Sequence, residues 1–548
     1  NIAAMDCANS CLGGELLEDR VIAERGYKRF REFFRLIAEN GNVFEFNSPT
    51  YTQVTLKALH LLRRYVKDPA TRLLAELAAT RLGLSVALHL HPQSGRLAGP
   101  YSRAYYPTLQ PSSRAYSELL QTWIEEGIVP DWIGTVPRAE KLPFFLEETA
   151  HSDWRIGAST YLTPSFSMGL ASREVSRQTN PLVIQVYGED PSETAMIFAR
   201  YSMNDSIEKE VPPKSAFGID GSFFDDGKFL GVQQGNRAIG VYAPREAETP
   251  DSLAPASRHR FASARASLVW LDRKKATRIW VGENEVKELP HQVERGKVMV
   301  IETPPARIAL LPLSITELGY DSPIRIAEKD GRLYLDMYNY LGEEKTFGEL
   351  DRGSRFYRGQ PQCAFYVEVA DQSAHPDAPS FAREVAGGTV RDGVAPPFTS
   401  YRDDARRPWV LEYAREGKTL GLEVDLMEWR LLRRWNENGD LGWPMLESPM
   451  ARQNSQGRIE LAGATLECGK APALLYGDPA AGLWVAAYYG DPAPLSLSLP
   501  GGSVRIERMG PGTLAWRKGE VTLDTLDLEG PPKIVGGALR EREKGVDQ

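Results

Sequence analysis

The sequence predicts a multidomain α+β protein, in which a helical N-terminal domain precedes antiparallel β-structure. Three observations favour this fold class. The 548 residues exceed the size at which one hydrophobic core keeps growing. In the first third of the chain, apolar residues recur every three or four positions, as in amphipathic helices. From about Pro181 they alternate with a period of two, as in β-strands.

The helical domain is predicted from separate apolar stripes joined by short turns. Successive helices with one apolar face each are typical of antiparallel hairpins packed in a curved or toroidal array, and a bundle is the alternative. Ser48 and Pro49 form a favourable N-cap and first-turn pair, so we expect one helix to begin there. The first stripe contains Leu16, Leu17, Val21, Ile22, Phe30, Phe33, Phe34 and Ile37, and the predicted helices cover residues 16–40, 48–68, 71–90 and 112–126.

The remainder of the chain predicts strands without helices between them. Such a pattern indicates antiparallel stacked sheets rather than a parallel sheet interleaved with helices. We therefore expect an α/α toroid-like domain over residues 1–175 and an antiparallel β-sandwich over residues 176–548. The strand candidates are residues 182–187, 195–201, 266–272, 276–282, 297–302, 307–313, 332–341, 363–370, 483–489 and 503–509.

Composition excludes several classes of function. The net charge of −8 argues against a nucleic-acid-binding surface, and no apolar run is long enough to span a membrane. The cysteines are too few and too scattered for a disulfide framework or a zinc site, so we expect no metal and no cofactor. The chain opens at Asn1 without a Met or a basic leader region, and its first residues resemble a helix entered midway, so we expect a processed or truncated N-terminus.

The first polar constellation is the segment from Glu45 to Tyr51. A helix that begins at Ser48 would present free backbone N–H groups, which together with the helix dipole favour a bound carboxylate. Asn47 would add a side-chain donor beside them. The alternative is that Asn47 and Ser48 only cap the helix and that Tyr51 belongs to the core.

The second constellation is a loop over residues 95–106, in which three tyrosines surround Arg103. Functional groups concentrate on loops held by rigid elements, and an arginine beside a tyrosine suits proton transfer next to a carboxylate. Tyr101 and Tyr105 are therefore candidates for the acid or the base. The alternative is a packed aromatic loop in which Arg103 stacks on a ring or pairs with an acid.

The third constellation, residues 151–155, lies near the predicted domain junction. His151 offers a base, Trp154 a platform for stacking a sugar and Arg155 a fork for a carboxylate. The alternative is a structural histidine. His89 and His91 are predicted to be helix-end residues rather than metal ligands, because residues two apart on a helix point in different directions.

Together these segments resemble the heparinase II/III-like polysaccharide lyases. The resemblance rests on EFNSPTY (45–51), LAGPYSRAYY (97–106), HSDWRIGASTYLTPSFSMG (151–169) and FLGVQQGNRAIGVY (229–242). It implies an incomplete α/α toroid followed by antiparallel sheets, with the substrate in the cleft between them. It also implies β-elimination on a uronic-acid-containing polysaccharide, and hence a secreted or periplasmic protein that binds an acidic saccharide but neither nucleic acid nor a membrane.

The resemblance further implies residue roles. Asn47 would neutralise the uronate carboxylate, Tyr101 or Tyr105 would be the acid or base, and His151 a second proton-transfer group. The substrate-binding set would be Arg103, Tyr51, Trp154, Arg155 and Glu45. Lyases of this type often carry an Asn-His pair, whereas Ser48 follows Asn47 here, so the choice between tyrosine and histidine as the base stays open.

Two other functions remain as alternatives. A glycoside hydrolase on a helical toroid would use paired carboxylates. A non-catalytic carbohydrate-binding protein would keep Trp154 and the tyrosines without a tuned base. The carboxylates available to a hydrolase are Glu45, Glu147, Glu148 and Asp153.

Overall fold

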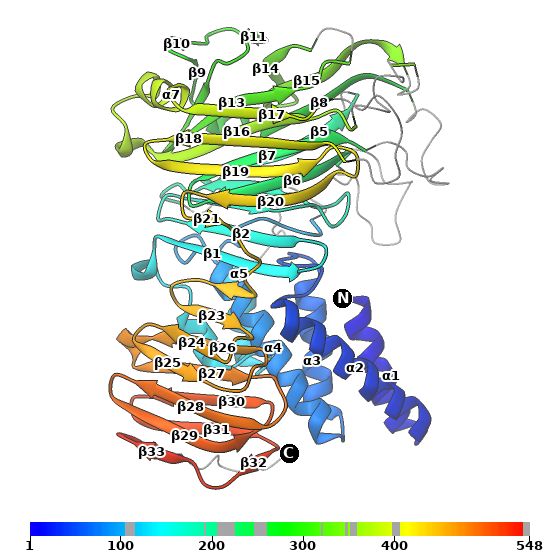
Figure 1. The fold of residues 1–548 in the computed structure, drawn as a ribbon, viewed down its shortest axis with the longest axis vertical. Helices are drawn as coiled ribbons and strands as arrows, with labels where there is room; N and C mark the ends of the chain where they lie inside the picture. Colours follow the sequence, from blue (N-terminus) through cyan, green and yellow to red (C-terminus); the bar gives the residue numbers. More distant parts are fainter. Residues whose placement is uncertain are drawn as a thin grey trace.

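The computed structural model describes residues 1–104, 116–190, 193–204, 225–245, 260–318, 322–345, 349–350, 359–396 and 406–540. The N-terminal helices lie beside the lower half of the molecule, and strands extend over its whole length (Figure 1). This arrangement confirms the α+β class that the sequence predicts.

The N-terminal helices begin and end at recognisable signals. The Asp19 side chain accepts hydrogen bonds at the start of α2, and Gly41, with φ of 102°, ends that helix. Asp68 caps α4. The helices are α1 (Ile2–Leu16), α2 (Arg20–Asn40), α3 (Thr52–Tyr65), α4 (Pro69–His89), α5 (Tyr116–Glu125) and α7 (Ala378–Ala386).

Two details of the predicted helices are wrong. Helix α3 begins at Thr52 rather than at Ser48, because the Ser48 hydroxyl accepts the N–H of Tyr51 in a turn that precedes the helix. The first predicted apolar stripe also crosses the turn between α1 and α2, and its first four residues lie on the surface. These exposed residues are Leu16, Leu17, Val21 and Ile22. Residues 112–115 of the last predicted helix lie outside the described residues.

The central sheet runs through the whole molecule. Its neighbouring strands are antiparallel, except that β31 and β34 are parallel. In spatial order it contains β11 (His291–Val293), β14 (Ile324–Lys329), β15 (Arg332–Lys345), β8 (Phe261–Trp270), β5 (Ala195–Met203), β4 (Leu182–Val186), β3 (Phe166–Ala171), β2 (Ile156–Leu162), β1 (Phe144–His151), β22 (Leu446–Glu447), β23 (Ala451–Asn454), β26 (Ala473–Asp478), β27 (Leu483–Tyr488), β30 (Gly512–Arg517), β31 (Glu520–Thr525) and β34 (Ala538–Leu539).

Three further antiparallel sheets pack around the central sheet. The second contains β10 (Asn284–Glu285), β9 (Arg278–Val281), β12 (Met299–Thr303), β13 (Ala306–Ile315), β16 (Cys363–Asp371), β7 (Arg237–Pro244) and β6 (Gly227–Gln234). The third contains β17 (Thr389–Val394), β18 (Pro408–Arg415), β19 (Lys418–Asp425), β20 (Arg430–Asn436) and β21 (Gly439–Asp440). The fourth contains β24 (Arg458–Leu461), β25 (Ala464–Glu467), β28 (Ala493–Leu499), β29 (Gly502–Met509), β32 (Leu528–Glu529) and β33 (Lys533–Val535).

Shared hydrophobic cores show how these layers are joined. The helices pack on the central sheet, since Leu77 of α4 and Leu146 of β1 belong to one core. The upper half of the central sheet packs on the second sheet, where Ile184 and Leu310 share another core. The third sheet and α7 cover the outer face of the second sheet, and the fourth sheet packs on the lower half of the central sheet.

The predicted helical range of residues 1–175 contains strands. Helix α5 ends at Glu125, and β1, β2 and β3 occupy positions between 144 and 171. The period of two is present in β1, where Leu146 and Glu148 share the side that faces the helices. The polar residues around His151 indicate a site motif, and they interrupt the period of two between β1 and β2.

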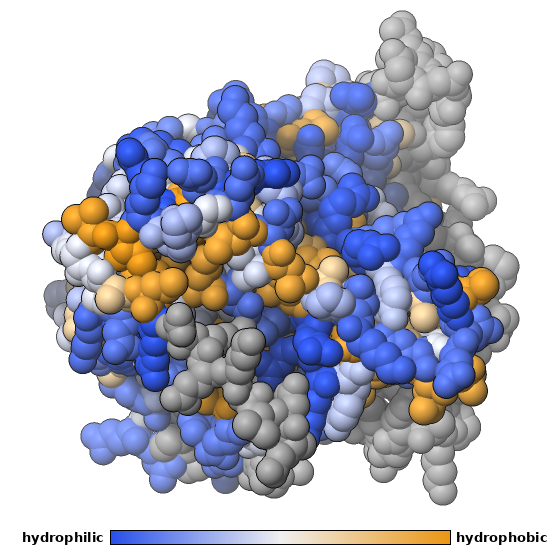
Figure 2. Space-filling model, turned by 90° about the horizontal axis from the view of Figure 1, so that it is seen from below, coloured by the Kyte–Doolittle hydropathy of each residue, from blue (hydrophilic) through white to orange (hydrophobic). Residues whose placement is uncertain are grey.

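The surface carries apolar side chains at one end. Figure 2 views the molecule from the end of the C-terminal strands and shows apolar side chains among polar ones. In this part of the chain the exposed large apolar residues are Leu526, Leu528, Val535 and Leu539. None of the helices that the structure describes is long and apolar enough to cross a membrane.

Candidate functional site

Three aromatic rings gather on the surface beside the junction of the helices with the central sheet. His151 and Trp154 stack with their ring centroids 4.7 Å apart, and the ring of Phe44 lies nearly perpendicular to Trp154, with the two centroids 5.4 Å apart. Trp154 is 55% exposed and Phe44 38% exposed. We call these three residues the aromatic platform. The exposed indole of Trp154 suits stacking against the apolar face of a sugar ring.

The turn that carries His151 and Trp154 is fixed by hydrogen bonds to α2 and to the third sheet. The backbone N–H of Ser152 donates to Oδ1 of Asn40 at 2.9 Å. The Arg155 guanidinium donates to the carbonyl oxygens of Leu431 and Leu432, the latter at 2.7 Å. Arg155 was predicted to bind a substrate carboxylate, and its Nη1 is the donor that contacts the third sheet. Its φ of 55° is typical of a tight turn.

The tautomer of His151 follows from its contact with the platform turn. The backbone N–H of Trp154 donates to Nδ1 of His151 at 3.4 Å. A neutral imidazole whose Nδ1 accepts a hydrogen bond carries its proton on Nε2. In this tautomer His151 presents a donor to a ligand. Accepting a proton would require the ring to give up the long contact to Trp154.

A second group lies next to Phe44 along the chain. Nη1 of Arg103 lies 2.8 Å from Oε1 of Glu45, and the guanidinium lies over the ring of Tyr51, 4.9 Å from its centroid. The other Glu45 oxygen lies 2.9 Å from the backbone nitrogen of Asn1. The structure therefore brings together three predicted residues from two separate motifs. The ion pair matches the predicted alternative in which Arg103 pairs with an acid.

Asn47 binds the protein's own backbone. Its Nδ2 donates to the carbonyl oxygens of Ala98 and Pro100, each at 2.8 Å, and the residue is buried with φ of 43°. Both amide protons are used in this way, and Oδ1 has no partner among the described residues. Asn47 thus joins the two predicted polar loops, and it offers no free donor for a uronate carboxylate in this conformation.

Tyr101 is a core residue. Its hydroxyl donates to the Leu97 carbonyl at 2.5 Å and accepts from Nε2 of Gln185 at 2.7 Å. Burial raises the pKa of this phenol well above its usual value, and the nearby Tyr187 adds to the increase. Arg96, rather than Arg103, is the arginine that opposes this shift. Tyr105 lies outside the described residues.

The carboxylates considered for a hydrolase do not form an open pair. Glu148 is buried, and it accepts hydrogen bonds from Arg81 at 3.0 Å and from Asn42 at 2.9 Å. Burial alone would raise its pKa, but Arg81 and its other partners hold the pKa below its usual value. Glu147 points to the other face of β1, where Arg434 lies 3.5 Å away. Asp153 is exposed in the platform turn.

Sequence reasoning identified two of the three platform residues and missed Phe44. The signal for Phe44 was weak, because a single aromatic residue before Glu45 is equally typical of a core position. The predicted helix-end histidines are confirmed in their position, since α4 ends at His89 and His91 follows it. Among the described residues, no three potential metal-ligating side chains of His, Cys, Asp or Glu come together.

Comparison with protein-family models gives a match in the N-terminal part of the chain. Residues 1–133 match the model of a domain of unknown function, DUF8769. This range contains the N-terminal helices, Phe44 and the Arg103 pair, but it ends before β1. No curated protein matches the chain.

Proposed function

We propose that the protein is a polysaccharide lyase that binds a uronic-acid-containing chain across the aromatic platform and cleaves it by β-elimination. The observation that carries this proposal is the exposed, stacked His151–Trp154 pair beside Phe44. Aromatic side chains that stay exposed in a folded protein can stack against sugar rings. The resemblance to heparinase II/III-like lyases supplies the reaction type. It also supplies the finer description of the fold as an α/α toroid followed by a β-sandwich.

The chemistry assigns separate tasks to the residues. A base removes the C5 proton of the uronate, the electron pair forms the C4–C5 double bond, and the O4 leaving group departs and takes up a proton. The C5 proton is acidic enough only when preorganised donors stabilise the negative charge that builds on the carboxylate. The Nε2–H of His151 is a donor of the required type at the platform.

We propose Tyr105 as the base. Tyr101 is buried with its hydroxyl engaged on both sides, and Nδ1 of His151 accepts the backbone N–H of Trp154. Tyr105 is the remaining candidate from the sequence. Its role is a proposal that rests on the resemblance and on the proximity of Arg103 in the sequence.

The substrate class accounts for the expected location. A polymer of acidic sugars lies outside the cell, so we propose a secreted or periplasmic protein whose partner is that polymer. No cofactor is required for proton abstraction and elimination.

The test is direct because elimination leaves an unsaturated sugar. The full chain is incubated with a panel of uronate polymers, and the near-ultraviolet absorbance of the new double bond is followed. We expect absorbance with at least one polymer, and its loss in Tyr105→Phe with binding retained. New reducing ends without absorbance would indicate a hydrolase instead, and binding without either product would indicate a carbohydrate-binding protein.

A further inference from the structure

A polar pocket lies at the far end of β2 from the aromatic platform. Tyr161 lines it, five residues along β2 from Ile156, which corresponds to roughly 16 Å of extended strand. Its other walls come from the β6–β7 turn of the second sheet and the β18–β19 hairpin of the third sheet. The pocket therefore opens where three sheets meet. Its volume of about 240 Å³ limits it to a small ligand.

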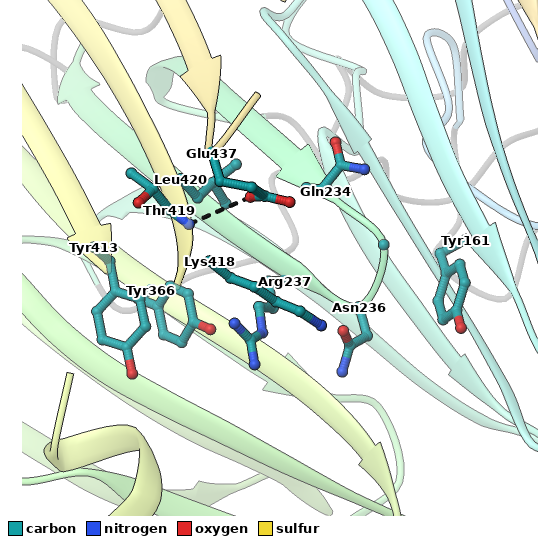
Figure 3. Close-up of a pocket in the computed structure, with 11 residues that line it drawn as sticks. Tyr161, Gln234, Asn236, Arg237, Tyr366, Tyr413, Lys418, Thr419, Leu420 and Glu437 are labelled. Atoms are coloured by element: carbon teal, nitrogen blue, oxygen red, sulfur yellow. Dashed lines mark hydrogen bonds between the residues drawn. The ribbon is translucent and has the colours of Figure 1, made fainter. Parts of the chain in front are cut away.

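Two cationic side chains extend into the middle of this pocket. Figure 3 shows Arg237 and Lys418 between Tyr366 and Tyr413 on one side and Asn236 and Tyr161 on the other. Within the described part of the chain, the Lys418 ammonium makes no ion pair. The only acidic residue of the lining is Glu437 on the rim, which accepts the backbone N–H of Thr419 at 3.3 Å.

The charge of Arg237 is only partly neutralised. Its Nε lies 3.3 Å from Oε1 of Glu368, but the same oxygen accepts a hydrogen bond from Arg415 at 2.9 Å. The other Glu368 oxygen accepts from the Tyr366 hydroxyl at 2.6 Å. One carboxylate thus serves two arginines behind the pocket wall. The wall keeps positive character, which favours an anion in front of it.

The opposite side of the pocket offers hydrogen-bonding groups. The Tyr161 hydroxyl has no hydrogen-bond partner among the residues that the structure describes. Burial and the carboxylate of Asp371 raise the pKa of Tyr161, so its phenol stays protonated and can donate. Asn236 uses Nδ2 on the Val369 carbonyl at 2.7 Å, and this leaves its Oδ1 as an acceptor.

We propose that this pocket binds one anionic sugar unit. Its carboxylate or sulfate would lie between Lys418 and Arg237, and its ring hydroxyls would meet Tyr161 and Asn236. The stacked pair of Tyr366 and Tyr413, with centroids 3.9 Å apart, forms a rigid wall beside that anion. This binding site is distinct from the aromatic platform and does not depend on the proposed lyase activity.

The experiment measures binding of monosaccharides to the full chain by calorimetry. Glucuronate is the anionic probe, glucose is its neutral match, and inorganic sulfate tests the anion alone. We expect glucuronate to bind more tightly than glucose and sulfate to compete with it. Lys418→Gln should weaken glucuronate binding about tenfold, because it removes a charge-assisted hydrogen bond at an exposed position.

Matched variants locate the binding. Lys470 is an exposed lysine next to the fourth sheet, so Lys470→Gln should leave the dissociation constant unchanged. Tyr161→Phe keeps the ring and should weaken binding about threefold. If Lys418→Gln binds glucuronate as wild type does, if glucose binds equally well, or if Lys470→Gln weakens the binding as much as Lys418→Gln does, the proposal is overturned. A wild-type protein without lyase product contradicts the proposed function and leaves these measurements unaffected.

Discussion

The imidazole of His151 stacks on the indole of Trp154 with the two ring planes 16° from parallel. The ring of Phe44 lies nearly perpendicular to both, and its centroid is 6.4 Å from that of His151 and 5.4 Å from that of Trp154. The pair thus combines an apolar surface with a polar edge that carries Nε2. One turn of the chain supplies both the stacking face for a sugar and a donor for its substituents.

Trp154→Ala should weaken binding of the polymer substrate about tenfold, which corresponds to the loss of about 1.4 kcal/mol of apolar contact. The melting temperature should change little, because the indole is more than half exposed. The measurement is the Michaelis constant together with thermal unfolding. Tyr65→Ala is the matched control, since Tyr65 is 57% exposed on α3. Equal effects of the two variants would contradict a role for the platform.

Asn47 variants should change stability in a defined order. Asn47→Gly keeps the positive φ but loses two hydrogen bonds, and we expect it to cost about 2 kcal/mol. Asn47→Ala should cost about 1 kcal/mol more, because alanine is strained at that φ. Asn47→Asp should be the least stable, because a carboxylate would face two carbonyl oxygens. Denaturant unfolding measures these differences.

The outcome for Asn47 separates its structural contacts from a catalytic task. If Asn47→Ala lost turnover while its free energy of unfolding stayed at the wild-type value, the hydrogen bonds to Ala98 and Pro100 would not be its main contribution. The assignment as carboxylate neutraliser, which the sequence suggested, would then return.

Tyr101→Phe should lower the free energy of unfolding by about 1 to 3 kcal/mol, because it removes a buried hydroxyl that both donates and accepts. Turnover should change less than about threefold, since the hydroxyl is not accessible to a substrate. Nε2 of Gln185 keeps its second bond to the Leu97 carbonyl in the variant. A hundredfold fall in kcat with unchanged stability would contradict this expectation.

His91 should make stability depend on pH below neutrality. Burial lowers its pKa from 6.5 to about 4, although contacts with the carbonyls of Thr163 and Pro164 oppose the shift. The folded protein therefore keeps His91 neutral while the unfolded chain takes up a proton. Its contribution to stability is fully present above pH 6.5 and is lost as the pH falls to about 4, by up to about 3 kcal/mol.

The control for this effect is the difference between wild type and His91→Gln. Other groups titrate in both proteins, so they cancel in the difference between the two free energies of unfolding. The stability advantage of the wild type over His91→Gln should therefore shrink by up to about 3 kcal/mol as the pH falls from 7 to 4. A constant difference over this range would show that His91 does not carry the dependence.

Periodicity predicted most of the fold. Strand β18 alternates buried and partly exposed residues, and that period of two is visible in a single sequence, whereas β4 is buried along its whole length and shows a short apolar run instead. The pairing of β1 with β22 was not predictable, because only two residue pairs join these distant segments. The packing of the third sheet on the second was likewise not predictable, because it also depends on contacts between segments far apart in the sequence.

The site was less predictable than the fold, because a polar residue does not reveal where it directs its hydrogen bonds. Asn47 has donors suited to a carboxylate, yet it uses them on two backbone carbonyls, and Nη1 of Arg155 likewise donates to backbone carbonyls. Trp154 was easier to recognise, since a large aromatic residue in a polar turn has few buried partners nearby.

In the central sheet, β1 can pair with β22 only after β22 has been synthesised. Glu147 of β1 pairs with Glu447 of β22, 300 positions further along the chain. At ribosomal speeds of about 5 to 20 residues per second, β1 waits roughly 15 to 60 seconds for its second neighbour. During that interval one edge of β1 stays open to any other strand, in the nascent chain or in another molecule. The yield of folded protein should therefore depend on translation speed and on chaperones that shield this edge.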